Sequence, residues 1–419
     1  MPIQILPPAG APRVLAAAQL SNSLGDGAYY VTSALYFTRV VGLSPTQIGL
    51  ALTVAWAIGS VTGVPLGALA DRRGPRGTAV LLALATGASV ASFLFIRSFV
   101  AFLLAACLYA VAQCGLAAAR QALLAGLVTP ADRTGVLAHL QSTLNAGLAI
   151  GAAVGGIALN YDTHEAYLAV FALDAASFLL CALVLLRLPA VPRSAARGKG
   201  EPRLAVLRDR PYAVVTALNA VLLLRMPLLS LAIPLWVVDR TGAPSWLVSA
   251  LFVLNTLAVM AFQVRMARDV DGPRTATRAV RRSGLVMLAS CAVFALSAAG
   301  LPAWTTVAVL VAGAVLQVIA EMQQSAGSWQ ISFDLAPTHQ VGQYQGFFGT
   351  GVPVARTLGP LLLTSLLVVW GVPGWLLLGG IFLAASLAMG PAVRWAERAG
   401  SVTQAGQRIE SPRPLASEG

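Results

Sequence analysis

Charged residues are scarce in this sequence. Only 11% of its 419 residues are charged, whereas 57% are hydrophobic. Soluble domains carry about 25% charged residues, so this chain has too few charges to cover a water-facing surface. A run of about 20 apolar residues spans a bilayer as a helix, and the chain has room for a dozen such runs. The composition therefore predicts an all-α polytopic membrane protein.

Residues typical of metal, redox and hydrolytic sites are few or unsuitably placed. The four cysteines lie inside apolar segments, without CxxC or Cys/His spacing, and are expected to be small packing residues. The sequence contains no HExxH, GxSxG or GxxxxGK[ST] motif, which argues against a membrane-embedded enzyme and against ATP-driven transport. The N-terminus has no basic segment followed by a small-residue cleavage site, so a cleaved signal peptide is not expected. We expect no metal and no cofactor.

The basic residues lie between the apolar runs and not along one face. The net charge of +12 would favour a nucleic-acid partner in a soluble protein, but this distribution argues against one. With the N-terminus in the cytoplasm, 23 of the 28 basic residues fall in cytoplasmic segments; outside loops hold Arg39, Arg97 and Arg240. The positive-inside rule therefore predicts a multi-pass protein of the cell membrane with both termini cytoplasmic.

Apolar runs separated by polar breaks predict twelve transmembrane helices in two pseudo-symmetric six-helix bundles. The predicted organisation is an N-terminal bundle over 1–188, a cytoplasmic linker over 189–210, a C-terminal bundle over 211–398 and a disordered cytoplasmic tail over 399–419. The predicted spans are 14–38, 46–70, 77–96, 99–127, 134–160, 165–186, 211–238, 245–266, 283–300, 303–328, 343–370 and 373–393.

Two loops support an internal duplication. Asp71-Arg72-Arg73-Gly74-Pro75-Arg76 follows the second span, and Asp269-Val270-Asp271-Gly272-Pro273-Arg274 follows the eighth. Repeated six-helix halves are used by membrane transporters to build a binding site at their interface.

The first loop also carries a family resemblance. Residues 67–76 resemble motif A of the major facilitator superfamily, GxLaDrxGrr, at Gly67, Asp71, Arg72, Gly74 and Arg76; Pro75 departs from it. The resemblance implies a latch whose charge-assisted hydrogen bonds break when the cytoplasmic side opens. The alternative is a loop that only sets membrane orientation, which would explain the arginines but not Asp71 and Gly74.

A second motif lies in the fifth span. Gly147, Gly151, Gly155 and Gly156 resemble motif C of drug:proton antiporters, gxxxGPxxGG, with Ala152 where that motif has proline. Together with residues near Arg120 and Asp174, this is similar to bacterial multidrug and siderophore exporters of the superfamily. The alternative is that the glycines simply let two helices approach closely.

Ionisable residues inside predicted spans are candidates for function, because each costs about 2.5–3.5 kcal/mol at the bilayer centre. Asp26 and Glu321 are the candidate proton carriers, and Asp174 is expected to be structural. In the superfamily, spans one, four, seven and ten line the central cavity, where polar stripes occur in this sequence. The resulting cavity candidates are Asn22, Tyr29, Tyr30, Ser33, Tyr109, Gln113, Asn219, Arg225, Gln317, Gln324 and Arg356.

The repeat offset places Asp26 opposite Arg225. We hypothesise that Asp26 alternates between pairing with Arg225 or Arg356 and a solvated or substrate-bound state, carrying a proton as it switches. The alternative for Asp26 and Glu321 is a structural ion pair between helices. The sequence thus predicts a monomeric secondary transporter that uses the proton gradient to export small amphipathic organic compounds. Sodium coupling, and uptake of a metabolite by a symporter or facilitator, remain open.

Overall fold

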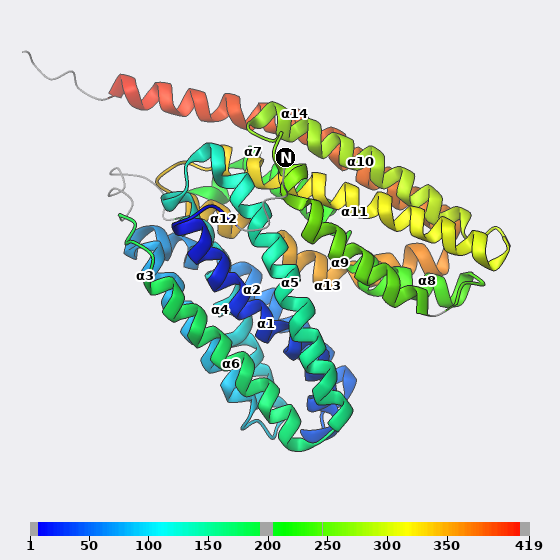
Figure 1. The fold of residues 1–419 in the computed structure, drawn as a ribbon. Helices are drawn as coiled ribbons and strands as arrows, with labels where there is room; N and C mark the ends of the chain where they lie inside the picture. Colours follow the sequence, from blue (N-terminus) through cyan, green and yellow to red (C-terminus); the bar gives the residue numbers. More distant parts are fainter. Residues whose placement is uncertain (1–6, 193–203, 245, 411–419) are drawn as a thin grey trace, which may run out of the picture.

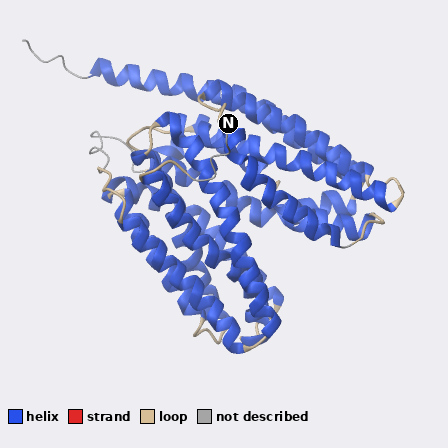
Figure 2. Cartoon of the chain, viewed as in Figure 1, coloured by secondary structure: helices blue, strands red, loops and turns tan. Residues whose placement is uncertain are grey.

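The computed structural model describes residues 7–192, 204–244 and 246–410, and these residues form helices joined by short connections, without a β-strand (Figure 2). Prolines and capping residues set several helix starts. At the start of α2, for example, the Ser44 hydroxyl accepts from the Gln47 amide, while the Gln47 side chain accepts from the Ser44 amide. Pro45 occupies the first helical position, where its missing N–H removes no helical bond.

The N-terminal bundle contains six helices, and the first continues into a π-helical turn at Tyr36–Val40. The six are α1 (Ala11–Leu35), α2 (Pro45–Arg73), α3 (Pro75–Phe93), α4 (Phe99–Leu127), α5 (Arg133–Tyr161) and α6 (His164–Leu186).

In the C-terminal bundle, two of the predicted spans are broken. Predicted span 211–238 consists of α7 (Arg210–Leu223), a π-helical turn at Leu228–Ala232, and α8 (Ile233–Arg240). Predicted span 343–370 consists of α12 (Val341–Phe348), α13 (Gly351–Leu363) and a π-helical turn at Thr364–Val369. The remaining helices are α9 (Trp246–Ala267), α10 (Pro273–Leu296), α11 (Ala303–Asp334) and α14 (Val372–Glu410).

The break in the first of these spans has a local cause. Pro227 lies between α7 and the π-helical turn, and it has no N–H to donate to the carbonyl of residue 223, where α7 ends. An apolar run predicts that a segment crosses the membrane, but it does not predict where the helix is interrupted.

Two helices extend further than their apolar runs. α10 begins at Pro273, well before the predicted start at residue 283, because the Thr275 hydroxyl accepts from the amides of Asp271 and Gly272, and the arginines that follow are good helix formers. α14 continues to Glu410, so residues 399–410 are helical where the sequence predicts a disordered tail. Propagating an existing helix costs less than starting one. Residues 411–419 of that tail, and residues 193–203 of the predicted linker, lie outside the described residues.

Helix packing repeats between the bundles. In the N-terminal bundle α1 packs on α5 and α6, α4 packs on α2 and α3, and α3 packs on α6. In the C-terminal bundle α7 packs on α13 and α14, α11 packs on α9 and α10, and α10 packs on α14. These are the same pairings in corresponding spans, as expected from a duplication.

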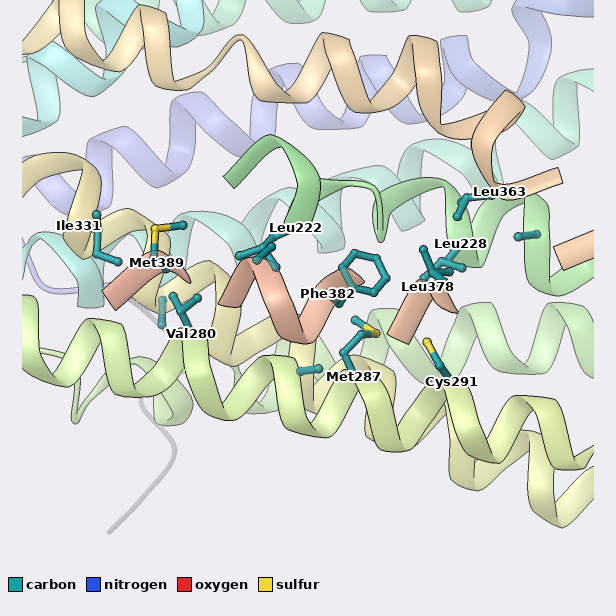
Figure 3. Close-up of a cluster of buried hydrophobic side chains, with 14 of the residues drawn as sticks. Leu222, Leu228, Val280, Met287, Cys291, Ile331, Leu363, Leu378, Phe382 and Met389 are labelled. Carbon is teal, nitrogen blue, oxygen red and sulfur yellow. The ribbon is translucent and has the colours of Figure 1, made fainter. Parts of the chain in front are cut away.

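Apolar side chains lie both in the core and on the outside. In the C-terminal bundle, side chains from α7, α10 and α14 interlock, including Leu222, Met287 and Phe382 (Figure 3). On the outside, Phe95 and Trp304 are 80% and 77% exposed. Eleven helical segments of the described chain are long and apolar enough to cross a membrane, and α1 is not among them. An apolar outer surface of this extent indicates a multi-pass membrane protein.

The two bundles meet at one end and diverge toward the other (Figure 1). We call the meeting end the arginine-rich end, because it carries the arginines that flank the α2–α3 and α9–α10 connections. There Thr134 of α5 donates a hydrogen bond to Gln330 of α11. The Arg133 guanidinium lies 5.4 Å from the centroid of the Phe333 ring. At the opposite end, the α5–α6 and α8–α9 connections lie far apart (Figure 1).

Candidate functional site

A cavity of about 620 Å³ lies between the two bundles and is lined by both. Its N-terminal wall comes from α1, α2, α4 and α5, and its C-terminal wall includes α7, α9, α11 and α13. Nine of the residues predicted from sequence line it. They are Asp26, Tyr30, Gln113, Asn219, Arg225, Gln317, Glu321, Gln324 and Arg356.

The other candidates lie beside the cavity or away from it. Asn22 lines a smaller adjoining pocket of about 270 Å³ that also includes Asp26. Tyr109 is buried, lines neither pocket and donates a hydrogen bond to Asp26. Tyr29 packs among aromatic rings, with its centroid 5.4 Å from that of Phe171. Ser33 lines neither pocket.

Asp26 is held by a chain of polar side chains within the N-terminal bundle. Asn22, one helical turn earlier on α1, donates to Asp26 Oδ2 at 3.1 Å, and the Tyr109 hydroxyl donates to Oδ1 at 3.4 Å. Gln113 donates to the Tyr109 hydroxyl at 3.0 Å, and Arg120 donates to the Asn22 amide oxygen at 3.1 Å. Asp26 is only 6% exposed, and both of its carboxylate oxygens accept a hydrogen bond.

Arg225 is paired with Glu321, and not with Asp26 as hypothesised from the repeat. Arg225 Nη1 lies 2.8 Å from Glu321 Oε1, and the two side chains are 9% and 21% exposed. Arg225 also donates to Gln324 at 2.9 Å and to Ser325 at 3.0 Å. Glu321 and Gln324 lie on one face of α11, so this helix supplies acceptors for the guanidinium from within the same bundle. Asn255 of α9 donates to the second Glu321 oxygen at 3.1 Å.

Arg356 lies across the cavity on α13. Its guanidinium carbon is 5.1 Å from the centroid of the Trp56 ring on α2, a cation–π contact between the bundles. None of the described carboxylates forms an ion pair with it. Arg356 is exposed and lines the cavity.

The motif A residues connect the bundles at the arginine-rich end. The Asp71 carboxylate accepts from the amides of Gly342 and Gln343 at 2.8 and 2.9 Å, and so caps the start of α12. A Cβ placed on Gly67 would lie 2.0 Å from the Gly342 carbonyl oxygen, so only glycine allows this approach. Gly74 has a φ of 100°, which favours glycine in the turn.

The arginines of the motif have different surroundings. Arg76 donates to the Leu188 carbonyl oxygen at 2.7 Å, at the end of α6, whereas Arg72 is exposed. Asp71 and Gly67 therefore form the inter-bundle contact described above, whereas Gly74 allows the turn.

Three of the four motif C-like glycines pack against α1. A Cβ on Gly147, Gly151 or Gly155 would lie 2.6, 2.0 and 2.9 Å from the nearest α1 atom, respectively. Gly156 faces open space. This is the close helix approach that the sequence analysis gave as the alternative to an antiporter motif.

Sequence reasoning missed several polar residues of the cavity. Asn255 and Ser325 bind the Arg225–Glu321 pair, and Gln141 and Asn145 of α5 line the cavity wall. A single amide in an apolar span was the available signal for Asn255. Among the described residues, no group of three or more His, Cys, Asp or Glu side chains could hold a metal ion.

Two helical bundles in a membrane, with a cavity that both of them line, point to a transporter and not to an enzyme. The sequence profile of the Major Facilitator Superfamily matches residues 15–320, and the chain belongs to this family. No curated protein sequence gives a significant match.

Solved structures with the same fold cover nearly the whole chain. A bacterial homologue of the iron transporter ferroportin, in an outward-facing state, is 14% identical over 92% of this chain and 99% of its own, with a TM-score of 0.72. The human organic anion transporter MFSD10 is 20% identical over 90% and 98%, with a TM-score of 0.70. The proton:xylose symporter XylE is 15% identical over 91% and 95%, with a TM-score of 0.69. At these identities the likeness shows the shared fold.

Proposed function

We propose that the protein is a proton-coupled secondary transporter that exports small amphipathic organic compounds across the cell membrane. The observation that carries the proposal is the cavity between the bundles, which contains the membrane-embedded acid Asp26 and is lined by both halves. A site shared by two halves can open to alternate sides as the halves rock around it. The polar wall and the aromatic side chains Tyr30 and Trp56 suit a solute with polar and apolar parts.

The proposal includes twelve spans, with α1 as the first. With its π-helical turn, α1 covers residues 11–40 and packs along α5 and α6. Polar residues such as Asn22 and Asp26 lower its hydropathy, which explains why it differs from the eleven apolar segments.

By the positive-inside rule, the arginine-rich end and both termini are cytoplasmic. The structure then corresponds to an outward-facing state, as in the similar ferroportin homologue and the fucose transporter FucP.

In this proposal Asp26 takes up and releases the proton. Burial favours its neutral form, whereas the donors Asn22 and Tyr109 favour the carboxylate. A change in hydration as the bundles rock would shift the balance between these forms. Glu321 is the second candidate, and release of Arg225 would be needed before it could accept a proton. Sodium is the alternative coupling ion, because Asp26 and Asn22 offer oxygen ligands.

Uptake by symport or facilitated transport is the second candidate function, and one observation favours it. Arg356 carries a positive charge in the cavity, forms no ion pair with a described carboxylate and interacts with Asp26 over a longer distance. An anion bound there would favour a neutral Asp26, so the anion and the proton would bind together and not in exchange. Antiport and symport therefore predict opposite directions of proton movement.

Proteoliposomes with a trapped pH-sensitive dye and an imposed proton gradient test both candidates. Addition of lipophilic cations, aromatic anions, antibiotics and sugars in turn should cause substrate-dependent proton movement, and its direction distinguishes antiport from symport. We expect Asp26→Asn to reduce this movement to background while substrate binding persists, because an amide cannot carry the proton.

The matched control is Glu165→Gln. It changes an exposed acid in the first turn of α6, outside the cavity, and should leave the proton signal unchanged. Undiminished proton movement in the Asp26→Asn protein would rule out its role as the carrier. If the wild type moves a solute without any proton movement, the protein is a facilitator or uses another coupling ion.

A further inference from the structure

The four acidic and basic side chains that line the cavity differ in the partners that they have. Arg225 and Glu321 neutralise each other at 2.8 Å, and the remaining Glu321 oxygen accepts from Asn255. Both oxygens of Asp26 accept hydrogen bonds from Asn22 and Tyr109. The acids of the cavity are therefore supplied with donors, whereas Arg356 forms no ion pair with a described carboxylate. Its charge acts on Asp26 from beyond ion-pair distance.

The hydrogen-bonding groups of Arg356 are available to a ligand. The Arg356 guanidinium carbon lies 5.1 Å from the centroid of the Trp56 ring. A guanidinium has five N–H donors, and no described residue accepts a hydrogen bond from those of Arg356. The contact with Trp56 also reduces the entropy lost when a ligand binds, because it limits the rotamers of the long side chain. Such an arginine is suited to bind a carboxylate or a similar planar acid through two parallel hydrogen bonds.

Other side chains that line the cavity are suited to the apolar part of the solute. Besides Trp56, the cavity is lined by Tyr30, Met226, Leu229 and Phe252. Large aromatic and thioether side chains bury apolar ligand surface effectively and adapt to its shape. Acidic and apolar parts of one molecule could thus be bound in the same cavity.

We propose that Arg356 and Trp56 form a subsite for the acidic group of an organic anion whose apolar body lies against the aromatic wall. This inference rests on the proposed function in one respect, that the cavity binds the transported solute. It adds the chemical class of that solute, an amphipathic carboxylate or a comparable acid. A lipophilic cation would instead meet a positive charge at this position, and the two acids that could offset that charge already have partners.

The test uses the full chain, purified in detergent, and three probes of the same shape and different charge. These are 2-naphthoate, 2-naphthylmethanol and 2-naphthylmethylammonium, and their binding is measured by isothermal titration calorimetry without a proton gradient. We expect naphthoate to bind most tightly. Equal or tighter binding of the alcohol or the cation, or no binding by any of the three, would overturn the proposal.

Variants assign the binding to the subsite. Arg356→Gln should weaken naphthoate binding by about 10- to 100-fold, the range for hydrogen bonds to a charged group, without weakening the alcohol. Arg356→Lys keeps the charge but loses the planar donors, so its affinity should fall between those of the wild type and Arg356→Gln. Arg97→Gln is the matched control, because Arg97 lies in the α3–α4 connection and donates to carbonyl oxygens of Leu94 and Ile96.

The outcomes separate this inference from the proposed function. Unchanged naphthoate affinity in both Arg356 variants overturns the subsite, even if proton-coupled transport is observed with other solutes. Naphthoate binding that depends on Arg356, in a protein that moves no protons in vesicles, supports the subsite and contradicts the coupling. A thermal unfolding midpoint measured for each variant verifies folding, and Arg356→Lys provides the comparison if Arg356→Gln does not fold.

Discussion

Arg225, in the turn that follows α7, and Glu321 of α11 form a largely buried ion pair within the C-terminal bundle. Removing two charges from water is unfavourable, and their attraction offsets this only with good geometry and further hydrogen bonds. Both conditions hold here, since the pair is 2.8 Å apart and each partner has additional neighbours in Gln324, Ser325 and Asn255. The stability of the bundle is therefore more sensitive to loss of one partner than to loss of both.

We expect Glu321→Gln to destabilise the protein by about 3 kcal/mol, near the lower end of the range for breaking a buried pair, because Arg225 would remain charged and unpaired. The exposed fraction of Glu321, 21%, keeps the effect from being larger. Thermal unfolding in detergent measures it. The double variant Arg225→Gln/Glu321→Gln should recover part of the loss, and a single variant as stable as the wild type would contradict the argument.

The sequence predicted many of the polar residues that line the cavity, but it did not predict which of them form an ion pair. The i, i+4 spacing of Asn22 and Asp26 fixes a helical face, and this face lies toward the pockets. The repeat offset suggested Arg225 as the partner of Asp26, but Arg225 is paired with Glu321. An offset along the chain gives equivalent positions in two bundles, whereas the reach of a side chain depends on helix rotation and on neighbours such as Gln324.

At the level of elements, the crossing of α1 and α5 depends on glycine. The backbones approach so closely that a Cβ on Gly151 would lie 2.0 Å from the Leu24 carbonyl oxygen. Close backbone approach increases dispersion contacts, which favour helix association where lipid removes the hydrophobic driving force. The sequence identified the glycine-rich face, but it did not separate the glycines that contact α1 from Gly156, which does not.

We expect Gly151→Ala to destabilise the N-terminal bundle by about 1–3 kcal/mol, as overpacking does in other cores, since neither backbone can yield without shifting a whole helix. Gly156→Ala is the matched control, because it lies on the same helix with open space around it. It should be neutral or slightly stabilising, given the low helix propensity of glycine. Thermal unfolding midpoints of the two variants test this prediction. Equal midpoints would show that the close α1–α5 contact does not determine the stability of the bundle.

At the level of the whole molecule, the Asp71 side chain of α2 is one of the contacts that join the two bundles at the arginine-rich end. Asp71 caps the first turn of α12, where unsatisfied amides and the helix dipole both favour a negative charge. The contact is present in the arrangement seen here and would break if the bundles separated at this end. It therefore stabilises one conformation of the transporter relative to the other.

We expect Asp71→Asn to shift the population toward separation at this end, because the neutral amide has one acceptor oxygen for two amides. Charged hydrogen bonds contribute about 1.5–3 kcal/mol, enough to change the ratio of the two states by about 10-fold or more. Spin labels at Gly77 and Asp271, one exposed position on each bundle at this end, would report the change as a longer distance. An unchanged distance distribution would show that Asp71 does not control this equilibrium.

The glycine contact between α2 and α12 has a consequence for the membrane potential. Gly67 lies against Gly342, and Gly63 lies against Gly346, at separations that leave no space for even a methyl group at Gly67 or Gly346. Such a layer is an electrical insulator, whereas water in a cavity conducts, so the voltage should fall mainly across the arginine-rich end. A charge that crosses this layer gains or loses about 2.3 kcal/mol per 100 mV. The voltage would therefore act chiefly on the conformational change, and only weakly on the binding of a charged solute in the cavity.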